Sequence, residues 1–236
     1  MKSMPFQGPQ HGPIFRFIAF FARLRFWYLL RGLRNRKILR IMFLFTAGVT
    51  ALGTITIMAY LTDLMLLFPP LGPSAFILFH TPLAETASPR NVVLAHTLAL
   101  LAGLGSLALI GSISPDAVVD AAAGLNWANV AAIALAMGLA SMAMVTLGCV
   151  HPPAAATALI AAMGFLSNIV QISGVLIAVV ILVLEAVVFN RILGGLPFPL
   201  WRFDPEVIND HPSLAGLPRH GQTSWQKMVT KMFHRR

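Results

Sequence analysis

Charged side chains are scarce in this sequence, and cysteine is almost absent. Only 11% of the residues are charged and the mean hydropathy is +0.78, whereas an ordinary soluble domain carries roughly 25% charged residues. So few charges cannot coat a soluble surface, but several lipid-facing helices would explain the shortfall. Cys149 is the single cysteine, which excludes an intrachain disulfide. We therefore predict an all-α membrane protein with no soluble domain.

Acidic residues are missing from the first forty positions, which contain nine Lys and Arg. Residues 41–189 contain one basic residue, Arg90, and the last 46 positions contain the other seven. Basic residues beside membrane segments mark the cytoplasmic side. We therefore expect a protein of the bacterial inner membrane with both termini in the cytoplasm. The aromatic, Arg-rich residues 14–30 are typical of an interfacial helix on an anionic leaflet. We expect lipids, and no nucleic acid, as partners of these ends.

Apolar stretches of two lengths divide the chain. Four are long enough to cross a hydrocarbon layer about 30 Å thick as helices, namely residues 41–61, 91–110, 128–150 and 169–193. Two are shorter and contain a Pro-Pro pair, namely residues 68–80 and 151–165. Proline lacks an amide hydrogen and keeps the preceding residue out of the helical region, yet it suits a first helical turn. Each short stretch is therefore predicted to be extended chain followed by a short helix.

The two short stretches align with each other at a shift of 83 residues, which places Ser74 on Thr157 and Phe68 on His151. Both halves of the chain then read long helix, proline break, short helix, long helix. We interpret this order as an internal duplication, although apolar sequences also align by chance. The predicted division is a basic N-terminal segment, a membrane domain with two repeats and a basic C-terminal tail, at residues 1–37, 38–195 (repeats 38–112 and 125–195) and 196–236.

The linker between the repeats carries Asp116 and Asp120 and no basic residue, so it is expected outside the cell. The chain must then cross the membrane an odd number of times before Gly111, and the first short stretch supplies the third crossing. Each repeat has three crossings in this interpretation, and the two repeats are inverted. The competing arrangement has re-entrant short stretches and four crossings, and it places the acidic linker inside.

Inverted repeats with broken helices bring the breaks together near the bilayer midplane. Two helix N-termini would meet there, each with a partial positive charge and several unpaired amide hydrogens, which together form an anion site. The predicted substrate-binding residues are Pro69, Pro70, Gly72, Pro73, Ser74, His151, Pro152, Pro153, Ala154 and Thr157. The alternative is structural, because the two hydroxyls could bond a carbonyl of their own helix and His151 could be a cap.

Other polar residues in apolar surroundings are candidates for coupling or gating, namely Glu185, His96, Arg90 and Asn91. Intramembrane acids are costly and are usually functional or paired, so Glu185 could relay a proton or form a structural pair. His96 is better explained by an interhelical hydrogen bond than by ligand binding, and Arg90 with Asn91 could simply cap and anchor the helix predicted at residues 91–110 at the cytoplasmic face. A metal site on His80, His96 and His151 is a second hypothesis, which no HExxH motif or cysteine cluster supports.

The sequence resembles the HPP family of integral membrane proteins at two motifs. One is the tripeptide His151-Pro152-Pro153, and the other is the run Ser88-Pro89-Arg90-Asn91-Val92-Val93 followed by His96. The resemblance covers about residues 41–195. It implies four membrane segments and a small membrane transporter, with plant members linked to nitrite transport in plastids. Our leading hypothesis is therefore a transporter or channel for a small inorganic anion, nitrite or nitrate first, and not an enzyme. We expect no cofactor or metal. A purely structural membrane subunit and a homo-oligomer both stay open.

Overall fold

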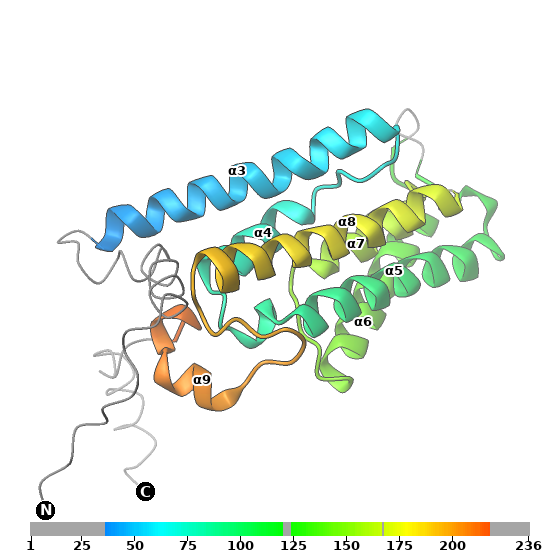
Figure 1. Ribbon diagram of the computed structural model, residues 1–236. Helices are drawn as coiled ribbons and strands as arrows, with labels where there is room; N and C mark the ends of the chain where they lie inside the picture. Colours follow the sequence, from blue (N-terminus) through cyan, green and yellow to red (C-terminus); the bar gives the residue numbers. More distant parts are fainter. Residues whose placement is uncertain (1–35, 120–123, 167, 218–236) are drawn as a thin grey trace, which may run out of the picture.

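The computed structural model describes residues 36–119, 124–166 and 168–217, and it shows a bundle of helices (Figure 1). The predicted interfacial helix at residues 14–30 lies outside these ranges, as does the end of the C-terminal tail. Within them, the helices are α3 (Arg36–Thr62), α4 (Leu71–His80), α5 (Pro89–Gly111), α6 (Trp127–Thr146), α7 (Ala154–Ala162), α8 (Ile169–Val187) and α9 (Pro205–Asp210).

Four of these helices, α3, α5, α6 and α8, are long and apolar enough to cross a membrane. They confirm the four long stretches read from hydropathy. A π-helical turn, Val188–Leu193, extends α8. The helix α6 ends at Thr146, four residues before its predicted end. Gly148 lies there with φ +56°, a conformation that suits glycine and ends a helix.

The two short helices begin directly after the proline pairs, as predicted. Residues 63–68 are not helical, and Pro70 is the cap residue of α4 at φ −58° and ψ −20°. The second segment repeats this arrangement, because Pro153 precedes α7 at φ −57° and ψ −27°. In both segments the second proline already has helical angles, so the chain turns into the helix without a side-chain cap.

One end of the bundle carries basic residues, and we call it the basic end. Arg40, near the start of α3, donates from Nη2 to the carbonyl of His80 at the end of α4 (2.8 Å). Arg90, at the start of α5, donates to the carbonyls of Gly148 (2.7 Å) and Leu147 (3.1 Å), just after α6. The basic end therefore holds the starts of α3 and α5 and the ends of α4 and α6 (Figure 1).

The opposite end carries Asp63 and Asp116, and we call it the acidic end. Asn129, in the first turn of α6, donates to the carbonyls of Asp116 (3.2 Å) and Ala117 (2.8 Å) after α5. The amide of Val119 donates to the carbonyl of Met163 after α7 (3.2 Å). Residues 63–80 thus run from the acidic end to the basic end, and residues 147–163 run the opposite way.

The centre of the bundle is α5, which packs against α6 and α7 through small side chains. A methyl group added at Gly103 would lie 2.5 Å from the carbonyl oxygen of Ala158 and from Cβ of Ala161. Helices approach closely in lipid where such small residues line the contact. The buried residues of this packing layer include Ala95, Ala99, Ala136, Ala140, Ala154, Ala158 and Ala162. A second, larger cluster joins α3, α4, α5 and α8.

The outward faces of the long helices carry large apolar side chains. Phe45 on α3 is 64% exposed, Leu101 on α5 is 61% exposed and Val145 on α6 is 69% exposed. Such surfaces suit contact with hydrocarbon and not with water. The described part of the chain is therefore an integral membrane domain, with α9 and its flanking loops at the basic end.

Candidate functional site

Four buried polar side chains meet where the two short helices approach α5, and we call Ser74, His96, His151 and Thr157 the polar cluster. Each of them has 0% exposed surface. His96 comes from α5, Ser74 from the first turn of α4, Thr157 from the first turn of α7, and His151 from the residue before the second proline pair. Three segments that are distant in the sequence are thus joined at one place.

Ser74 connects the two histidines. Its Oγ lies 3.1 Å from Nε2 of His96 and 2.9 Å from Nε2 of His151. The same oxygen lies 2.9 Å from the carbonyl oxygen of Pro70, one turn earlier in the chain. A hydroxyl has one proton and two lone pairs, so Ser74 can donate to one of these partners and accept from two.

The histidines have a second partner each. Nδ1 of His96 lies 2.8 Å from Oγ1 of Thr157, and Nδ1 of His151 lies 2.7 Å from the carbonyl oxygen of Thr86. A carbonyl only accepts, so Nδ1 of His151 carries a hydrogen and donates it. All four ring nitrogens are therefore paired inside the protein, as buried polar groups generally are.

His96 lies between residues of the two short segments that align with each other in the sequence. Ser74 and Thr157, which align at the shift of 83 residues, bond its two ring nitrogens. Phe68 and His151, which align at the same shift, both place their rings beside it, with centroid distances of 6.1 Å and 5.3 Å. The interhelical hydrogen bond expected of His96 is present, and it is the hub of the cluster.

The prediction of several unpaired amide hydrogens at the two helix N-termini is wrong. The amides of Leu71, Gly72 and Ser74 donate to carbonyls of residues 68–70, at 3.1, 3.2 and 3.2 Å. The amides of Ala154, Ala155 and Ala156 donate to carbonyls of residues 151–153 at 3.0, 3.1 and 3.1 Å. The helical angles of the second proline close a turn whose carbonyls reach these donors. The hydrogen-bonding groups directed into the cluster are consequently the hydroxyls and the imidazoles.

The remaining predicted binding residues fall into two groups. Pro70, Pro153 and Ala154 are buried beside the cluster, whereas Pro69, Pro73 and Pro152 are exposed. Gly72 is half-buried, and a methyl group added to it would meet open space. Along α5 the cluster lies toward the basic end. His96 is four residues from the midpoint of α5, or about 6 Å at 1.5 Å per residue.

The predicted coupling residues other than His96 lie outside the polar cluster. Arg90 satisfies the last carbonyls beyond α6, and Nδ2 of Asn91 donates to the carbonyl of Glu85 (3.1 Å). Glu185, on α8, interacts with Thr54 of α3, and one of its carboxyl oxygens is buried without a hydrogen-bond partner. Arg90 thus binds the carbonyls that follow α6 and does not cap its own helix α5, which was the alternative to gating.

The histidines of the metal hypothesis do not form one group. The ring of His80 stacks on Phe76 at the end of α4, with centroids 4.8 Å apart. Across the described ranges, no three His, Cys, Asp or Glu side chains lie close enough to hold a metal ion.

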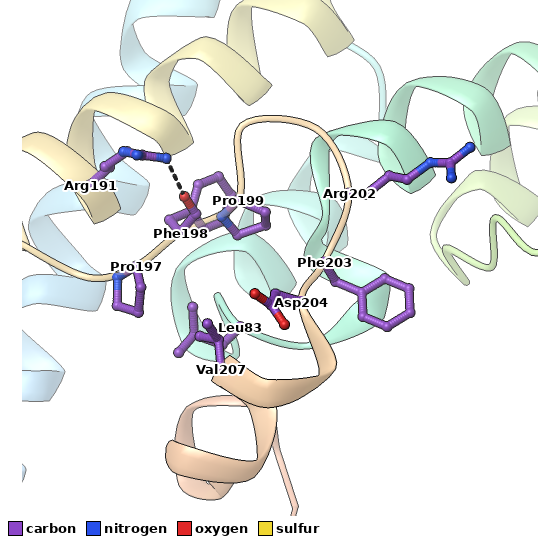
Figure 2. A pocket seen from close by; sticks show the side chains of 9 residues that line it. All are labelled: Leu83, Arg191, Pro197, Phe198, Pro199, Arg202, Phe203, Asp204 and Val207. Atoms are coloured by element: carbon purple, nitrogen blue, oxygen red, sulfur yellow. Dashed lines mark hydrogen bonds between the residues drawn. The ribbon is translucent and has the colours of Figure 1, made fainter.

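A separate pocket of about 200 Å³ lies at the basic end, between the end of α8 and the start of α9 (Figure 2). Arg191 donates to the carbonyl of Phe198 on its wall (3.1 Å). Figure 2 shows the guanidinium of Arg202 pointing away from that of Arg191, so the two positive charges do not converge on one ligand. Hydropathy and motif spacing gave no indication of this pocket.

An all-helical bundle with apolar outward faces and a buried polar cluster defines a polytopic membrane protein. The model of the HPP transmembrane region matches residues 33–199, which is more than half of the chain. The chain belongs to the HPP family of membrane proteins. A Dictyostelium discoideum protein described as a transmembrane protein is 31% identical over 147 residues, covering 59% of this chain and 46% of that relative. The chain thus matches less than half of the relative's length. No solved structure matches this chain.

Proposed function

We propose that the membrane domain consists of two inverted repeats, each with three crossings. The first proline-containing segment starts at the acidic end beside Asp63 and finishes at the basic end beside Arg40. The second starts beside Arg90 and finishes beside Val119, so the two segments run in opposite directions. A re-entrant segment would begin and finish at the same end. By the positive-inside rule, the basic end lies at the cytoplasmic face of a bacterial inner membrane, and both ends of the membrane domain lie there with it.

We further propose that the protein transports a small inorganic anion, bound at the polar cluster. The observation that carries this proposal is the convergence of Ser74 and Thr157, equivalent hydroxyls of the two repeats, on a buried histidine. Buried polar groups inside a membrane bundle are expensive and usually mark a substrate or ion path. Hydroxyl and imidazole N–H groups are donors that suit a small oxyanion.

An anion at this place must replace bonds that the cluster makes with itself. The Ser74 oxygen is within 3.1 Å of both imidazoles, which leaves no room for a ligand between them. Binding therefore requires α4 or α7 to shift relative to α5, and the internal bonds hold the closed arrangement when the anion has left. Exchange of one set of hydrogen bonds for another is how a transporter can close over a site without a ligand.

The substrate we propose first is nitrite or nitrate. Both are small, planar and monovalent, so two hydroxyls and one imidazole can bond one of them at the same time. The resemblance to a family with members linked to nitrite transport supports this choice.

Flux of labelled nitrate and nitrite into proteoliposomes tests the proposal. The variant with His151→Ala and Thr157→Val together should reduce flux by at least tenfold, since each lost bond to a charged ligand is worth about 1.5–3 kcal/mol. The matched control is His80→Ala with Thr97→Val. His80 stacks on Phe76, and the Thr97 hydroxyl bonds only the carbonyl of Val93 on its own helix. Equal flux through the two double variants would remove the cluster from the transport path.

A purely structural membrane subunit predicts no flux and no stabilisation by any anion. Thermal unfolding of the purified protein in a series of sodium salts separates this alternative from transport. Selective stabilisation by nitrite or nitrate, relative to chloride and sulfate at equal ionic strength, supports the transport proposal.

A further inference from the structure

The polar cluster can hold two different numbers of protons without leaving a ring nitrogen unpaired. When His151 is neutral, its Nδ1 donates to the carbonyl of Thr86, and its Nε2 accepts the single hydroxyl proton of Ser74. His96 then donates from Nε2 to Ser74 and accepts at Nδ1 from Thr157. Every donor in this state has an acceptor.

When His151 carries a second proton, only the hydroxyl of Ser74 has to turn. Both imidazoles now donate from Nε2 to the two lone pairs of the Ser74 oxygen. The hydroxyl proton turns to the carbonyl of Pro70, which lies 2.9 Å away. In the neutral state that carbonyl keeps the backbone amide of Ser74 as its donor (3.2 Å). One proton and one bond rotation therefore separate two fully bonded states.

The charges around the cluster show why such a proton matters. Arg90 is the one Lys or Arg between residues 41 and 189. Its guanidinium is already bonded to the carbonyls of Leu147 and Gly148. A monovalent anion buried in a low dielectric needs a compensating positive charge, and a histidine of the cluster is the remaining source at this depth.

The groups that face His151 favour this residue as the carrier. From α5 it faces His96, and from α4 it faces Ser74, which has no charge. From the loop before α5 it faces the carbonyl of Thr86, an acceptor that supports the charged ring. Glu85, which precedes Thr86 in the chain, has its side chain exposed at the same end of the bundle.

We propose that the protein is a proton–anion symporter that carries one proton on His151 with each monovalent anion. This inference rests on the proposed function of the polar cluster. A proton from water on the entry side adds to the Nε2 lone pair of His151, and the ring charge rises from zero to +1. The positive ring and the bound anion together carry no net charge while access to the site changes from one side of the membrane to the other, so one proton and one anion are transferred together. On the exit side Nε2 releases the same proton to water, and the hydroxyl of Ser74 turns back.

The first experiment needs no variant. Labelled nitrate entry is measured in proteoliposomes of the full chain, with an internal pH dye reporting protons, under either a pH gradient or a potassium–valinomycin membrane potential. We expect nitrate entry at an acidic outside, a proton-to-nitrate ratio near one, and no response to the potential, because the pair is neutral. Entry that follows the potential and ignores the pH gradient overturns symport but leaves anion transport standing. Nitrate entry no faster than in protein-free liposomes overturns both proposals.

The second experiment assigns the proton to a residue. In the His151→Gln variant, which keeps a hydrogen-bonding side chain but cannot be protonated, the remaining nitrate flux should carry protons at a ratio near zero. A ratio that stays near one removes His151 as the carrier. Should the variant show no flux, ¹⁵N spectra of the wild-type protein with labelled histidine decide. Addition of nitrate should protonate both nitrogens of the His151 ring, and a ring that stays neutral contradicts the proposal.

Discussion

The close contact between α5 and α7 at Gly103 allows a stability prediction with a matched control. A methyl group added at Gly103 of α5 would lie 2.5 Å from the carbonyl oxygen of Ala158, whereas ordinary contact begins at 3.4 Å. The obstacle is backbone, so α7 must retreat by about 0.9 Å. The bond between Thr157 and His96, now 2.8 Å, would be lengthened by up to the same distance and so weakened. We expect Gly103→Ala to lower the free energy of unfolding by about 1–3 kcal/mol.

Gly105→Ala is the control, because it adds the same methyl group to the same helix where nothing lies within 4 Å. Alanine is the better helix former, so this change should be neutral or stabilising by up to about 1 kcal/mol. Thermal unfolding in detergent, followed by circular dichroism, compares the two variants with the wild-type protein. A Gly103→Ala protein as stable as the Gly105→Ala protein would refute the close packing of α5 on α7.

Three further predictions test other parts of the bundle. Gly174→Ala should destabilise the protein by about 1–3 kcal/mol, because the new methyl group would lie 2.7 Å from the carbonyl oxygen of Met65. Gly53→Ala is the control, since its methyl group meets open space. Equal unfolding temperatures of these two variants would contradict the packing of α8 on residues 63–68. Arg90→Gln should lower the free energy of unfolding by about 1–3 kcal/mol, because it removes two charged hydrogen bonds to carbonyls beyond α6. An unchanged free energy of unfolding, measured by chemical denaturation, would count against a stabilising role for these bonds. Asn129→Ala should lower the free energy of unfolding by about 1–2 kcal/mol, because it removes the capping box of α6 and two hydrogen bonds to the loop after α5. Amide hydrogen exchange in the first turn of α6 should become faster, and exchange as slow as in the wild-type protein would argue against this role.

Much of the architecture could be predicted from the sequence because local chemistry decides it. Apolar runs of sufficient length form the four long helices whatever their neighbours are. The Pro-Pro pairs determine that Leu71 and Ala154 start short helices, since proline suits only the first turn. The early end of α6 was missed, although Gly148 was a visible signal for it.

The arrangement of the site depended on tertiary packing and was only partly predictable. The alignment of the two short stretches predicted that Ser74 and Thr157 would come together. Nothing local showed that His96 would lie between them, because that depends on how deeply α7 packs against Gly103. The amide donors were misjudged for another reason. The angles of Pro70 and Pro153 decide whether the first-turn amides are free, and these angles do not follow from residue type alone.

Equilibrium binding of nitrate to the Ser74→Ala variant is the decisive measurement for the proposal that the polar cluster binds a small anion. Ser106→Ala is the matched control, because Ser106 is a buried serine of α5 whose hydroxyl has no partner. Labelled nitrate is dialysed against each purified variant after thermal unfolding has verified that it is folded. We expect a dissociation constant at least tenfold higher for Ser74→Ala and an unchanged one for Ser106→Ala. Equal affinity in both variants would contradict the proposal.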